Sequence, residues 1–217
     1  MPSKKNIHFL RKCLQDSIAN HDPKGIAVNS TNLGDAYFNM GRYKKAIQHY
    51  QKSLDIFIDI GALSGVAYSN GRLGNASFKI GQYEKAINYY GKALEISAKL
   101  DDRKEIANSK GNLGNVYLKL GNFAQAIKCY KTSLEINTSI TYSSGIASNN
   151  GNLGNAYLSL GEYQKAIEYY ETGLQISTEI GDRSGIASNN GNLGNAYLSL
   201  GEYQKAIEYY ETGLQIS

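Results

Sequence analysis

The sequence is poor in the residues that interrupt helices or build reactive centres. Proline occurs only twice in 217 residues, at Pro2 and Pro23, so almost the whole chain lacks that helix breaker. The two cysteines, Cys13 and Cys129, lie on predicted helices and have neither metal-ligand nor disulfide spacing, and they are interpreted as reduced thiols. The three histidines fall in the first quarter of the chain without metal-ligand spacing. We therefore expect no metal and no cofactor.

Long apolar runs are also absent. No apolar stretch reaches the ~18 residues of a membrane-spanning helix, and the N-terminal Met-Pro-Ser-Lys-Lys-Asn lacks the apolar core of a signal peptide. No glycine-rich loop between a strand and a helix is present to hold a phosphate. These absences predict a cytoplasmic protein without a membrane partner and without catalytic activity.

Charge is dilute and unevenly distributed. The net charge is +4, but residues 1–100 carry 14 basic and 7 acidic residues (net +7), whereas residues 101–217 carry 9 and 12 (net −3). No basic cluster alternates with aromatic residues, so we expect no nucleic-acid partner. The charge gradient could instead bias how a charged partner lies along the molecule.

What the sequence does contain is a repeat. The 23 glycines recur at fixed intervals. The string Gly-Asn-Leu-Gly-Asn begins at Gly111, Gly151 and Gly191, with degenerate copies at Thr31 and Gly71, and the spacing is 40 residues throughout. Residues 146–177 and 186–217 are identical. Such a period indicates an architecture of stacked repeats.

Each 40-residue segment has the pattern of two amphipathic helices. In the fourth copy, one face of the first helix is formed by Ile146, Leu153, Tyr157 and Leu160. Gly161 is placed to end this helix. The apolar face of the second helix is formed by Tyr163, Ala166, Ile167, Tyr170, Leu174 and Ile180. Gly181 and Asp182 then form a stop and a new N-cap, and Gly154 and Ala166 are small where the two helices would cross.

The predicted fold is all-α, a right-handed superhelical α-solenoid of tandem helix–turn–helix repeats in one continuous domain. One isolated repeat cannot bury its apolar face, so neighbouring repeats must cover it. Leu10 and Leu14 indicate an N-terminal helix that covers the first repeat. The predicted segments are 1–23 for that helix and 24–61, 62–101, 102–141, 142–181 and the truncated 182–217 for the five repeats.

The repeat resembles the tetratricopeptide repeat. Its signature, Leu-Gly-x-x-Tyr followed by Ala-x-x-x-aromatic, is met by Leu153-Gly154…Tyr157 and Ala166…Tyr170. Matching copies are Leu33-Gly34…Tyr37 with Ala46…Tyr50, Leu113-Gly114…Tyr117 with Ala126…Tyr130, and Leu193-Gly194…Tyr197 with Ala206…Tyr210, while Ser77 replaces the tyrosine after Leu73-Gly74. The sequence departs from the family in two ways. Ser30, Asn70, Lys110, Asn150 and Asn190 replace the large aromatic before Leu-Gly, and the proline that usually ends the second helix is missing.

The long 40-residue form is similar to the repeats of the Partner-of-Inscuteable adaptors and of kinesin light chain, and to sensor arms of multidomain signalling proteins. The resemblance implies a scaffold or adaptor that binds extended peptide segments of partner proteins in a concave groove. An alternative is a structural or self-associating repeat arm of a larger multidomain signalling protein. A third reading, an RNA-binding helical repeat, is disfavoured because such repeats vary their reading residues, and two copies here are identical.

The predicted groove is lined by rows that recur every 40 residues on the first helices. One row is Asp35, Asn75, Asn115, Asn155 and Asn195, a second is Asn32, Arg72, Asn112, Asn152 and Asn192, and an apolar row is Phe38, Phe78, Leu118, Leu158 and Leu198. In the related adaptors, side chains at these places contact the bound peptide. An asparagine amide both donates and accepts hydrogen bonds, which suits a peptide backbone of any sequence.

Asp35 and Arg72 break these rows, and with Lys79 and Lys119 they are expected to set polarity or selectivity at the basic end. The competing interpretation is that the asparagines only keep an exposed face solvated. Asn195 has no evident packing role in the sequence, and it is a poor helix former, so a binding role is favoured. We further expect the last helices to expose apolar surface and to support concentration-dependent self-association.

Overall fold

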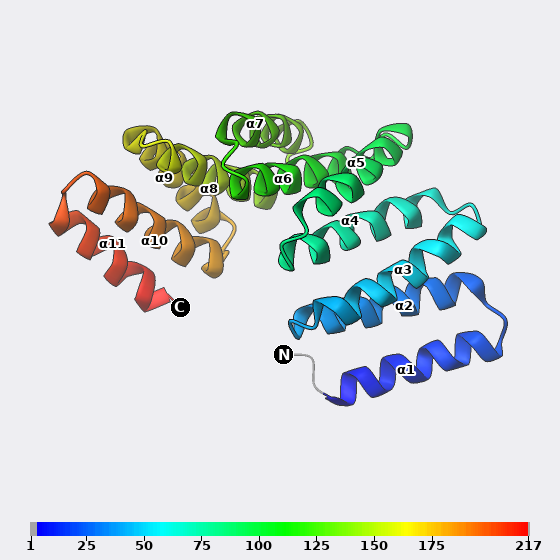
Figure 1. Cartoon of the computed structure of the whole chain (residues 1–217). Coiled ribbons are helices and arrows are strands. Elements are labelled where there is room, and N and C mark those ends of the chain that lie inside the picture. The colour runs from blue at the N-terminus through cyan, green and yellow to red at the C-terminus, as the bar shows by residue number, and fades with distance from the viewer. Residues whose placement is uncertain (1–3, 217) are drawn as a thin grey trace. The chain divides into compact units, whose positions relative to one another are not determined.

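The computed structural model describes residues 4–216, which form helices joined by short links (Figure 1). Residues 1–3, which belong to the N-terminal stretch predicted to lack a signal peptide, and Ser217 lie outside the described residues. Residues 4–216 form eleven helices and no strand, which confirms the all-α prediction. The helices are α1 (Lys4–Ala19), α2 (Pro23–Asn39), α3 (Tyr43–Asp59), α4 (Leu63–Lys79), α5 (Tyr83–Lys99), α6 (Arg103–Lys119), α7 (Phe123–Ser139), α8 (Ser143–Ser159), α9 (Tyr163–Glu179), α10 (Arg183–Ser199) and α11 (Tyr203–Ile216).

The chain divides into two compact units, Met1–Asn112 (unit 1) and Leu113–Ser217 (unit 2), so that α6 begins in unit 1 and ends in unit 2. In unit 1, α1 packs on α2, the pairs α2–α3 and α4–α5 form antiparallel hairpins, and α3 packs on α4. In unit 2, α7 packs on α8, the hairpins are α8–α9 and α10–α11, and α9 packs on α10. Each hairpin coincides with one 40-residue repeat. The tandem helix–turn–helix arrangement of a solenoid is therefore confirmed.

The links between helices follow a period of half a repeat. Helices α2 to α10 each contain 17 residues, and the link after each helix contains one residue with positive φ. At Gly161, which the sequence predicts as a helix stop, φ is +76°, and the Glu162 N–H donates to the Tyr157 carbonyl at 3.0 Å. This bond closes a Schellman motif, in which a left-handed residue turns the chain so that the next N–H can donate to a free carbonyl at the helix end. His21, Asp101 and Thr141 occupy the same place without being glycine, at φ of 51–52°.

The centre of each hairpin is a tyrosine ring lying on a glycine. A Cβ added at Gly154 would lie 2.4 Å from a ring carbon of Tyr170, so no larger residue fits without moving the ring. Tyr170, Leu153 and Ala166 are all fully buried. The prediction that Gly154 and Ala166 are small because the helices approach closely there is confirmed. The same close approach pairs Gly34 with Tyr50, Gly74 with Tyr90, Gly114 with Tyr130 and Gly194 with Tyr210.

Two details of the predicted helices differ from the structure, and a third is confirmed only in its position. Leu160 and Ile180 were assigned to apolar faces, but they are 44% and 42% exposed. Each is the C-cap residue of its helix, where the chain turns away and the side chain leaves the packed face. Asp182 does occupy an N-cap position, but its side chain accepts no capping hydrogen bond, in contrast to Asp22, which accepts from the Gly25 N–H at 2.9 Å.

Candidate functional site

The predicted binding residues lie on one side of the first helix of each repeat, which we call the first-helix face. Asp35 and Asn75 lie on α2 and α4 in unit 1, whereas Asn115, Asn155 and Asn195 lie on α6, α8 and α10 in unit 2. All five side chains are half-buried except that of Asn195, which is exposed. The row predicted from the sequence therefore lies at one equivalent position in each repeat.

The core tyrosine of every repeat donates a hydrogen bond to this row. The hydroxyl-to-Oδ1 distances are 2.7 Å for Tyr50–Asp35, 2.7 Å for Tyr90–Asn75, 2.8 Å for Tyr130–Asn115, 2.8 Å for Tyr170–Asn155 and 2.6 Å for Tyr210–Asn195. A carboxylate can only accept, so Tyr50 must be the donor to Asp35. The four asparagines repeat this geometry, and their amide oxygen takes the place of the carboxylate oxygen.

These bonds change what the asparagines can offer a partner. The amide oxygen is engaged by the tyrosine of its own repeat, whereas no hydrogen bond within residues 4–216 uses the Nδ2 of Asn155 or its three equivalents. The amide oxygen of each asparagine thus already accepts one hydrogen bond inside the repeat, and the NH₂ group is the part that stays open to a partner. The expectation that Asn195 has no packing role was wrong, because its amide oxygen accepts from the Tyr210 hydroxyl. Burial raises the pKa of Tyr90, Tyr130 and Tyr170, so these hydroxyls stay protonated and remain donors.

Arg72 lies in a polar cluster on the first-helix face of unit 1. Its Nε is 3.4 Å from Oδ1 of Asp35, and its Nη2 donates to the hydroxyl of Tyr68. Burial raises the pKa of the Glu105 carboxyl, while a hydrogen bond from Asn108 and the charge of Arg72 act in the opposite direction. Asp35 and Arg72, the two departures from the asparagine rows, thus pair with each other across α2 and α4.

Sequence reasoning missed Glu105, although a signal was present. Glycine occupies the equivalent place in the other repeats, at Gly25, Gly65, Gly145 and Gly185. A Cβ added at Gly71 would lie 3.2 Å from Oε1 of Glu105, which places this carboxylate over α4. The missing glycine therefore marks the position where an acidic side chain reaches the first-helix face.

The remaining predicted residues vary in exposure. Asn32, Lys79 and Lys119 are exposed, and Leu198 is 48% exposed. The half-buried ones are Asn112, Asn152, Leu158 and Asn192. In unit 1 the apolar row consists of the aromatic residues Phe38 and Phe78. The Phe38 ring packs edge-on against Tyr43, and the Phe78 ring packs at a tilt against Tyr83. Unit 2 presents leucines at the same place.

Other asparagines of the same helices are structural. Asn149 and Asn189 are buried, and Asn149 donates to the Ser133 hydroxyl of the preceding helix at 3.0 Å. Asn150 and Asn190, which replace the aromatic of the family signature, donate to carbonyls of their own helices at 2.9 Å. The asparagines of each first helix thus fall into two groups. Some are buried and form hydrogen bonds inside the protein, and the others lie on the first-helix face.

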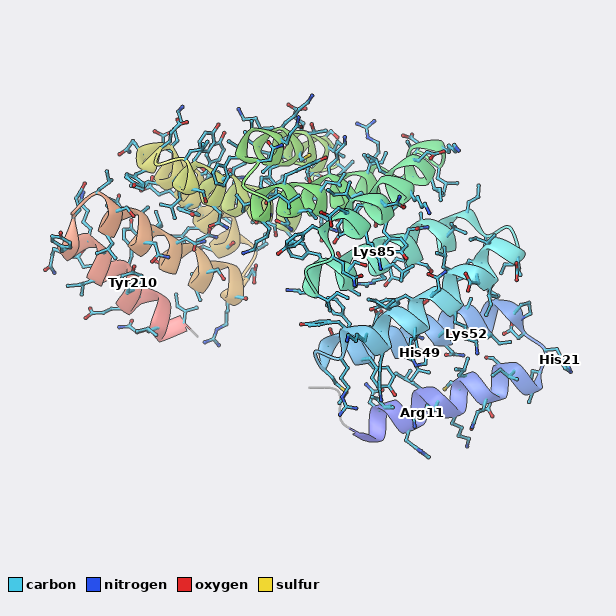
Figure 2. All side chains as sticks on the ribbon, viewed as in Figure 1. Arg11, His21, His49, Lys52, Lys85 and Tyr210 are labelled. Atoms are coloured by element: carbon cyan, nitrogen blue, oxygen red, sulfur yellow. The ribbon has the colours of Figure 1, made fainter. Side chains whose placement is uncertain are left out.

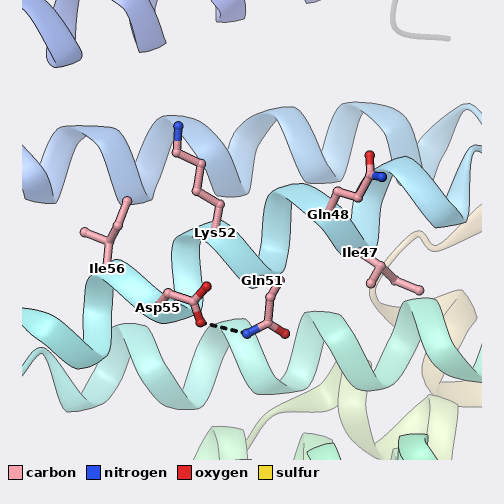
Figure 3. A pocket seen from close by; sticks show the side chains of 6 residues that line it. All are labelled: Ile47, Gln48, Gln51, Lys52, Asp55 and Ile56. Carbon is pink, nitrogen blue, oxygen red and sulfur yellow. Dashed lines mark hydrogen bonds between the residues drawn. The ribbon is translucent and has the colours of Figure 1, made fainter.

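A second surface feature lies on α3, the second helix of the first repeat. An open pocket of about 570 Å³ is lined by Ile47, Gln48, Gln51, Lys52, Asp55 and Ile56, all from α3 (Figure 3). Gln51 donates to Asp55 at 2.8 Å. Close to it, His49 stacks on Tyr37 with ring centroids 5.3 Å apart, and Figure 2 places Arg11 on the neighbouring α1. A pocket lined by a single helix offers little enclosure, so it is a weaker binding candidate than the first-helix face.

The described residues give no support for a metal site or a membrane span. Among residues 4–216 no group of three histidine, cysteine or acidic side chains is placed to hold a metal ion. Within the same residues, no helix combines the length and the apolarity needed to cross a bilayer.

Comparison with known proteins agrees with this geometry. A family profile described as tetratricopeptide repeat matches residues 64–139 and 145–217, and another of the same description matches residues 31–57. No curated protein sequence matches the chain.

Several solved structures share the fold. BtubC (BKLC) from P. vanneervenii is 23% identical, with a TM-score of 0.84 over 98% of this chain and 90% of that chain. A Rap protein complexed with Competence and Sporulation Factor is 21% identical, with a TM-score of 0.83 over 100% of this chain and 59% of that chain. The nearly identical TPR-like repeats of a putative kinesin light chain from Podosopora anserina are 20% identical, with a TM-score of 0.70 over 89% of this chain and 95% of that chain. The kinesin light chain match bears out the resemblance noted from the sequence.

Proposed function

Because the chain belongs to the tetratricopeptide-repeat family, we propose that its first-helix face binds an extended segment of a partner protein. The family fold is a scaffold for protein–protein interaction, so a partner is expected to be a protein. We further propose that the partner lies along the first-helix face and that side-chain NH₂ groups there donate hydrogen bonds to it. Among the solved relatives, the Rap protein was captured with Competence and Sporulation Factor.

The observation that carries the proposal is the tyrosine–asparagine bond. In each repeat the tyrosine fixes the amide oxygen of Asn75, Asn115, Asn155 or Asn195, and the NH₂ group is left as the free end of a held side chain. A donor that is already oriented loses little conformational entropy when it binds. Backbone carbonyls are present in every extended segment, whatever its side chains. The row therefore suits a sequence-tolerant grip on a peptide backbone.

The rest of the first-helix face differs between the units, which gives a basis for selectivity. In unit 1 the surroundings are aromatic and charged, with Phe38, Phe78 and the paired Asp35 and Arg72. In unit 2 the leucines Leu158 and Leu198 lie beside the amides, and Lys119 adds a positive charge near Asn115. We propose that the amides bind the backbone in both units and that unit 1 selects among side chains.

The test uses Asn115→Asp, Asn155→Asp and Asn195→Asp combined in the full chain. Aspartate keeps an acceptor for the tyrosine, as Asp35 does in the first repeat, but it removes the three NH₂ donors. The probe is a peptide selected from a displayed library of extended 12-residue peptides. Each lost hydrogen bond is worth about 0.5–1.5 kcal/mol, so affinity for the selected peptide should fall by at least ten-fold.

A matched control changes the charge by the same amount elsewhere. Gln125, Gln164 and Gln204 are exposed and lie in the first turns of second helices, and their combined change to glutamate should leave the affinity within about two-fold. Circular dichroism should show that both triple variants remain folded. Equal peptide affinity of the aspartate variant and the parent chain would refute the proposal.

A second candidate function is a structural arm that associates with other chains through its last helix. The observation that favours it is the outer face of α11, where Tyr203, Ile207 and Leu214 are 66%, 50% and 77% exposed. Apolar side chains this exposed and this close together are typical of interaction surfaces. Sedimentation of the full chain over a range of concentrations tests it, because a strict monomer would contradict self-association.

A further inference from the structure

The second helix of the first repeat, α3, carries basic side chains along one of its sides. Lys45, His49 and Lys52 follow each other at spacings of four and three residues, which places them in one row on the helix. At ~1.5 Å per residue, this row is about 10 Å long. The exposed Arg11 of α1 lies close enough for its charge to act on His49, as do the charges of the two lysines (Figure 2). We call these four residues the basic stripe.

A single buried ring holds the basic stripe together. The side chain of Tyr37, from α2, is buried, and its ring stacks on the imidazole of His49 with centroids 5.3 Å apart. The tyrosine hydroxyl accepts a hydrogen bond from Arg11 at 2.9 Å, and Nζ of Lys45 lies 5.6 Å from the ring centroid. Tyr37 therefore orders three of the four basic groups, but it brings no negative charge to balance them.

No carboxylate of the described residues balances these charges either. In the fourth repeat, Lys165 lies over the ring of Tyr157 in the same way, but it also forms an ion pair with Glu162. The first repeat has Arg42 in the place of that glutamate. Among residues 4–216, no ion pair includes a member of the basic stripe. The arrangement that is neutral in the fourth repeat is therefore positive in the first.

The open pocket on α3 adjoins the basic stripe. Lys52 belongs to both, and Ile47 and Ile56 give the pocket apolar walls (Figure 3). The carboxylate of the pocket, Asp55, accepts a hydrogen bond from Gln51 at 2.8 Å, whereas Lys52 extends to another side of the helix. This surface of the first repeat therefore places apolar side chains next to cations that have no ion-pair partner.

We propose that the basic stripe and the adjoining pocket bind an acidic segment of a partner protein. Carboxylates of this segment lie on the basic stripe, and an apolar side chain between them enters the pocket beside Ile47 and Ile56. The surface belongs to α1 and α3, whereas the first-helix face of the same unit belongs to α2 and α4. The acidic segment therefore has a site of its own, separate from the row of asparagines.

The length of the basic stripe favours a peptide over a single phosphate group. Alternate side chains of an extended segment point to the same side and are about 6.6 Å apart, so two or three carboxylates cover a row about 10 Å long. One phosphate group reaches only part of it. Single-stranded nucleic acid carries several phosphates, but its bases need exposed aromatic rings on which to stack. The pocket has no aromatic lining residue, and Tyr37 is buried.

The test removes the two lysines with substitutions that the fold already accepts. Lys45→Gln and Lys52→Thr are combined in the full chain, because the third repeat carries Gln125 and Thr132 at the equivalent positions. Displayed 12-residue peptides are selected on the parent chain, and those that also bind this variant are discarded. The second step removes any peptide held by the first-helix face, because the variant leaves that face unchanged.

The matched control is Lys85→Gln combined with Lys92→Thr, which makes the same changes at the equivalent, exposed positions of α5. The selected peptides should be rich in aspartate and glutamate around an apolar residue. Their affinity should fall by about ten-fold or more in the variant of Lys45 and Lys52, and it should stay within about three-fold in the control. Raising the salt concentration from about 0.05 M to about 0.3 M should weaken binding to the parent chain.

The protonation of His49 gives a second readout. In the free chain burial lowers the pKa of His49, and the charges of Lys52, Arg11 and Lys45 lower it further. The ring of Tyr37 faces it from α2, and within the described residues no charged group of α4, which also packs on α3, acts on it. Bound carboxylates favour the charged imidazole, so the pKa of His49, followed by NMR, should rise when a selected peptide binds. Binding should therefore tighten as the pH falls from about 7 to about 6, and His49→Gln should abolish this dependence.

Three results would overturn the proposal. The first is that no peptide survives the selection, or that the surviving peptides are not acidic. The second is equal weakening by the two pairs of lysine substitutions, because the general positive charge of unit 1 would then explain the binding. The third is single-stranded DNA of equal charge that displaces the peptides at a lower concentration than the peptides themselves require. None of these results involves the asparagines, so the proposed binding on the first-helix face would stand.

Discussion

At the scale of single residues, the bond between a core tyrosine and a first-helix asparagine links the fold to the proposed function. The tyrosine packs on a glycine, its hydroxyl reaches the edge of the core, and the asparagine receives it there. Replacing the asparagine therefore has two opposite effects on stability. Alanine is the better helix former, but its introduction leaves a tyrosine hydroxyl without its acceptor.

Asn155→Ala is predicted to lower the free energy of unfolding. Losing the acceptor of the Tyr170 hydroxyl costs about 1–3 kcal/mol, and the gain in helix propensity returns about 0.5–0.7 kcal/mol. In a Tyr170→Phe background, only the gain remains, so the same change should stabilise the chain. A double-mutant cycle by urea unfolding measures this reversal of sign. If Asn155→Ala stabilises both backgrounds equally, the hydrogen bond makes no contribution.

The sequence could identify the row of asparagines, but it could not show that the oxygen of each amide binds a tyrosine while the NH₂ group stays open. The 40-residue spacing places Asn115, Asn155 and Asn195 on one face, because helical periodicity is a property of the sequence. The partner of the amide oxygen lies 15 residues away, on the other helix of the hairpin. That contact depends on the depth at which the tyrosine ring sits on Gly154 or its equivalents. The depth of the ring is set by the packing of the two helices, and the periodicity of the sequence does not predict it.

At the scale of elements, the links decide where each helix ends. The glycine stops were predictable, because glycine recurs at Gly161 and Gly181 and tolerates a left-handed backbone. Asp101 and Thr141 were not predicted as left-handed residues, since aspartate adopts that conformation only occasionally and a β-branched threonine rarely. Their conformation follows from the length of the link, which the packed helices on both sides fix.

Thr141→Gly is predicted to stabilise the chain by about 0.5–1 kcal/mol. A β-branched residue at φ of +52° is strained, and relief of the strain exceeds the additional flexibility that glycine brings to the unfolded chain. Thr138→Gly, within the last turn of α7, is the control and should destabilise by about 0.3 kcal/mol, the difference in helix propensity between threonine and glycine. Thermal melts of the two variants should shift in opposite directions. A lower melting temperature for Thr141→Gly would contradict the account of the links.

The contact between α1 and the first hairpin is predicted to weaken in acid. Burial lowers the pKa of His49, with further lowering by the charges of Lys52, Arg11 and Lys45. The imidazole also stacks on Tyr37, whose hydroxyl accepts from Arg11 of α1 at 2.9 Å. The unfolded chain binds a proton at His49 at higher pH than the folded chain, so stability falls as the pH drops from about 7 to about 5.

Replacing the histidine should remove this dependence. His49→Gln should flatten the part of the stability–pH curve between about pH 7 and pH 5. Urea unfolding across this pH range gives the comparison. An unchanged slope in His49→Gln would show that His49 does not produce the effect.

At the scale of the whole molecule, the chain contains two segments of identical sequence, residues 146–177 and 186–217, and one of them can be removed without changing the sequence at the junction. Deleting residues 146–185 joins Gly145 to Ile186, where the sequence continues as it did at Ile146. Helix α7 then meets an α10 that has the same residues as α8, including an asparagine for Ser133. We predict a folded, all-helical protein of lower stability, because one repeat and one interface are lost. Circular dichroism and a melt test this, and loss of cooperative unfolding would contradict it.

The central claim is that the free NH₂ groups of the first-helix asparagines hold the backbone of a bound segment. The most direct measurement is NMR of the side-chain amides in a chain labelled with ¹⁵N-asparagine, with the library-selected peptide added in steps. The account predicts that the Nδ2 signals of Asn115, Asn155 and Asn195 shift with the binding curve, while those of the buried Asn149 and Asn189 stay in place. If the peptide saturates the chain and these three signals do not move, the asparagines do not hold the ligand, and the central claim is wrong.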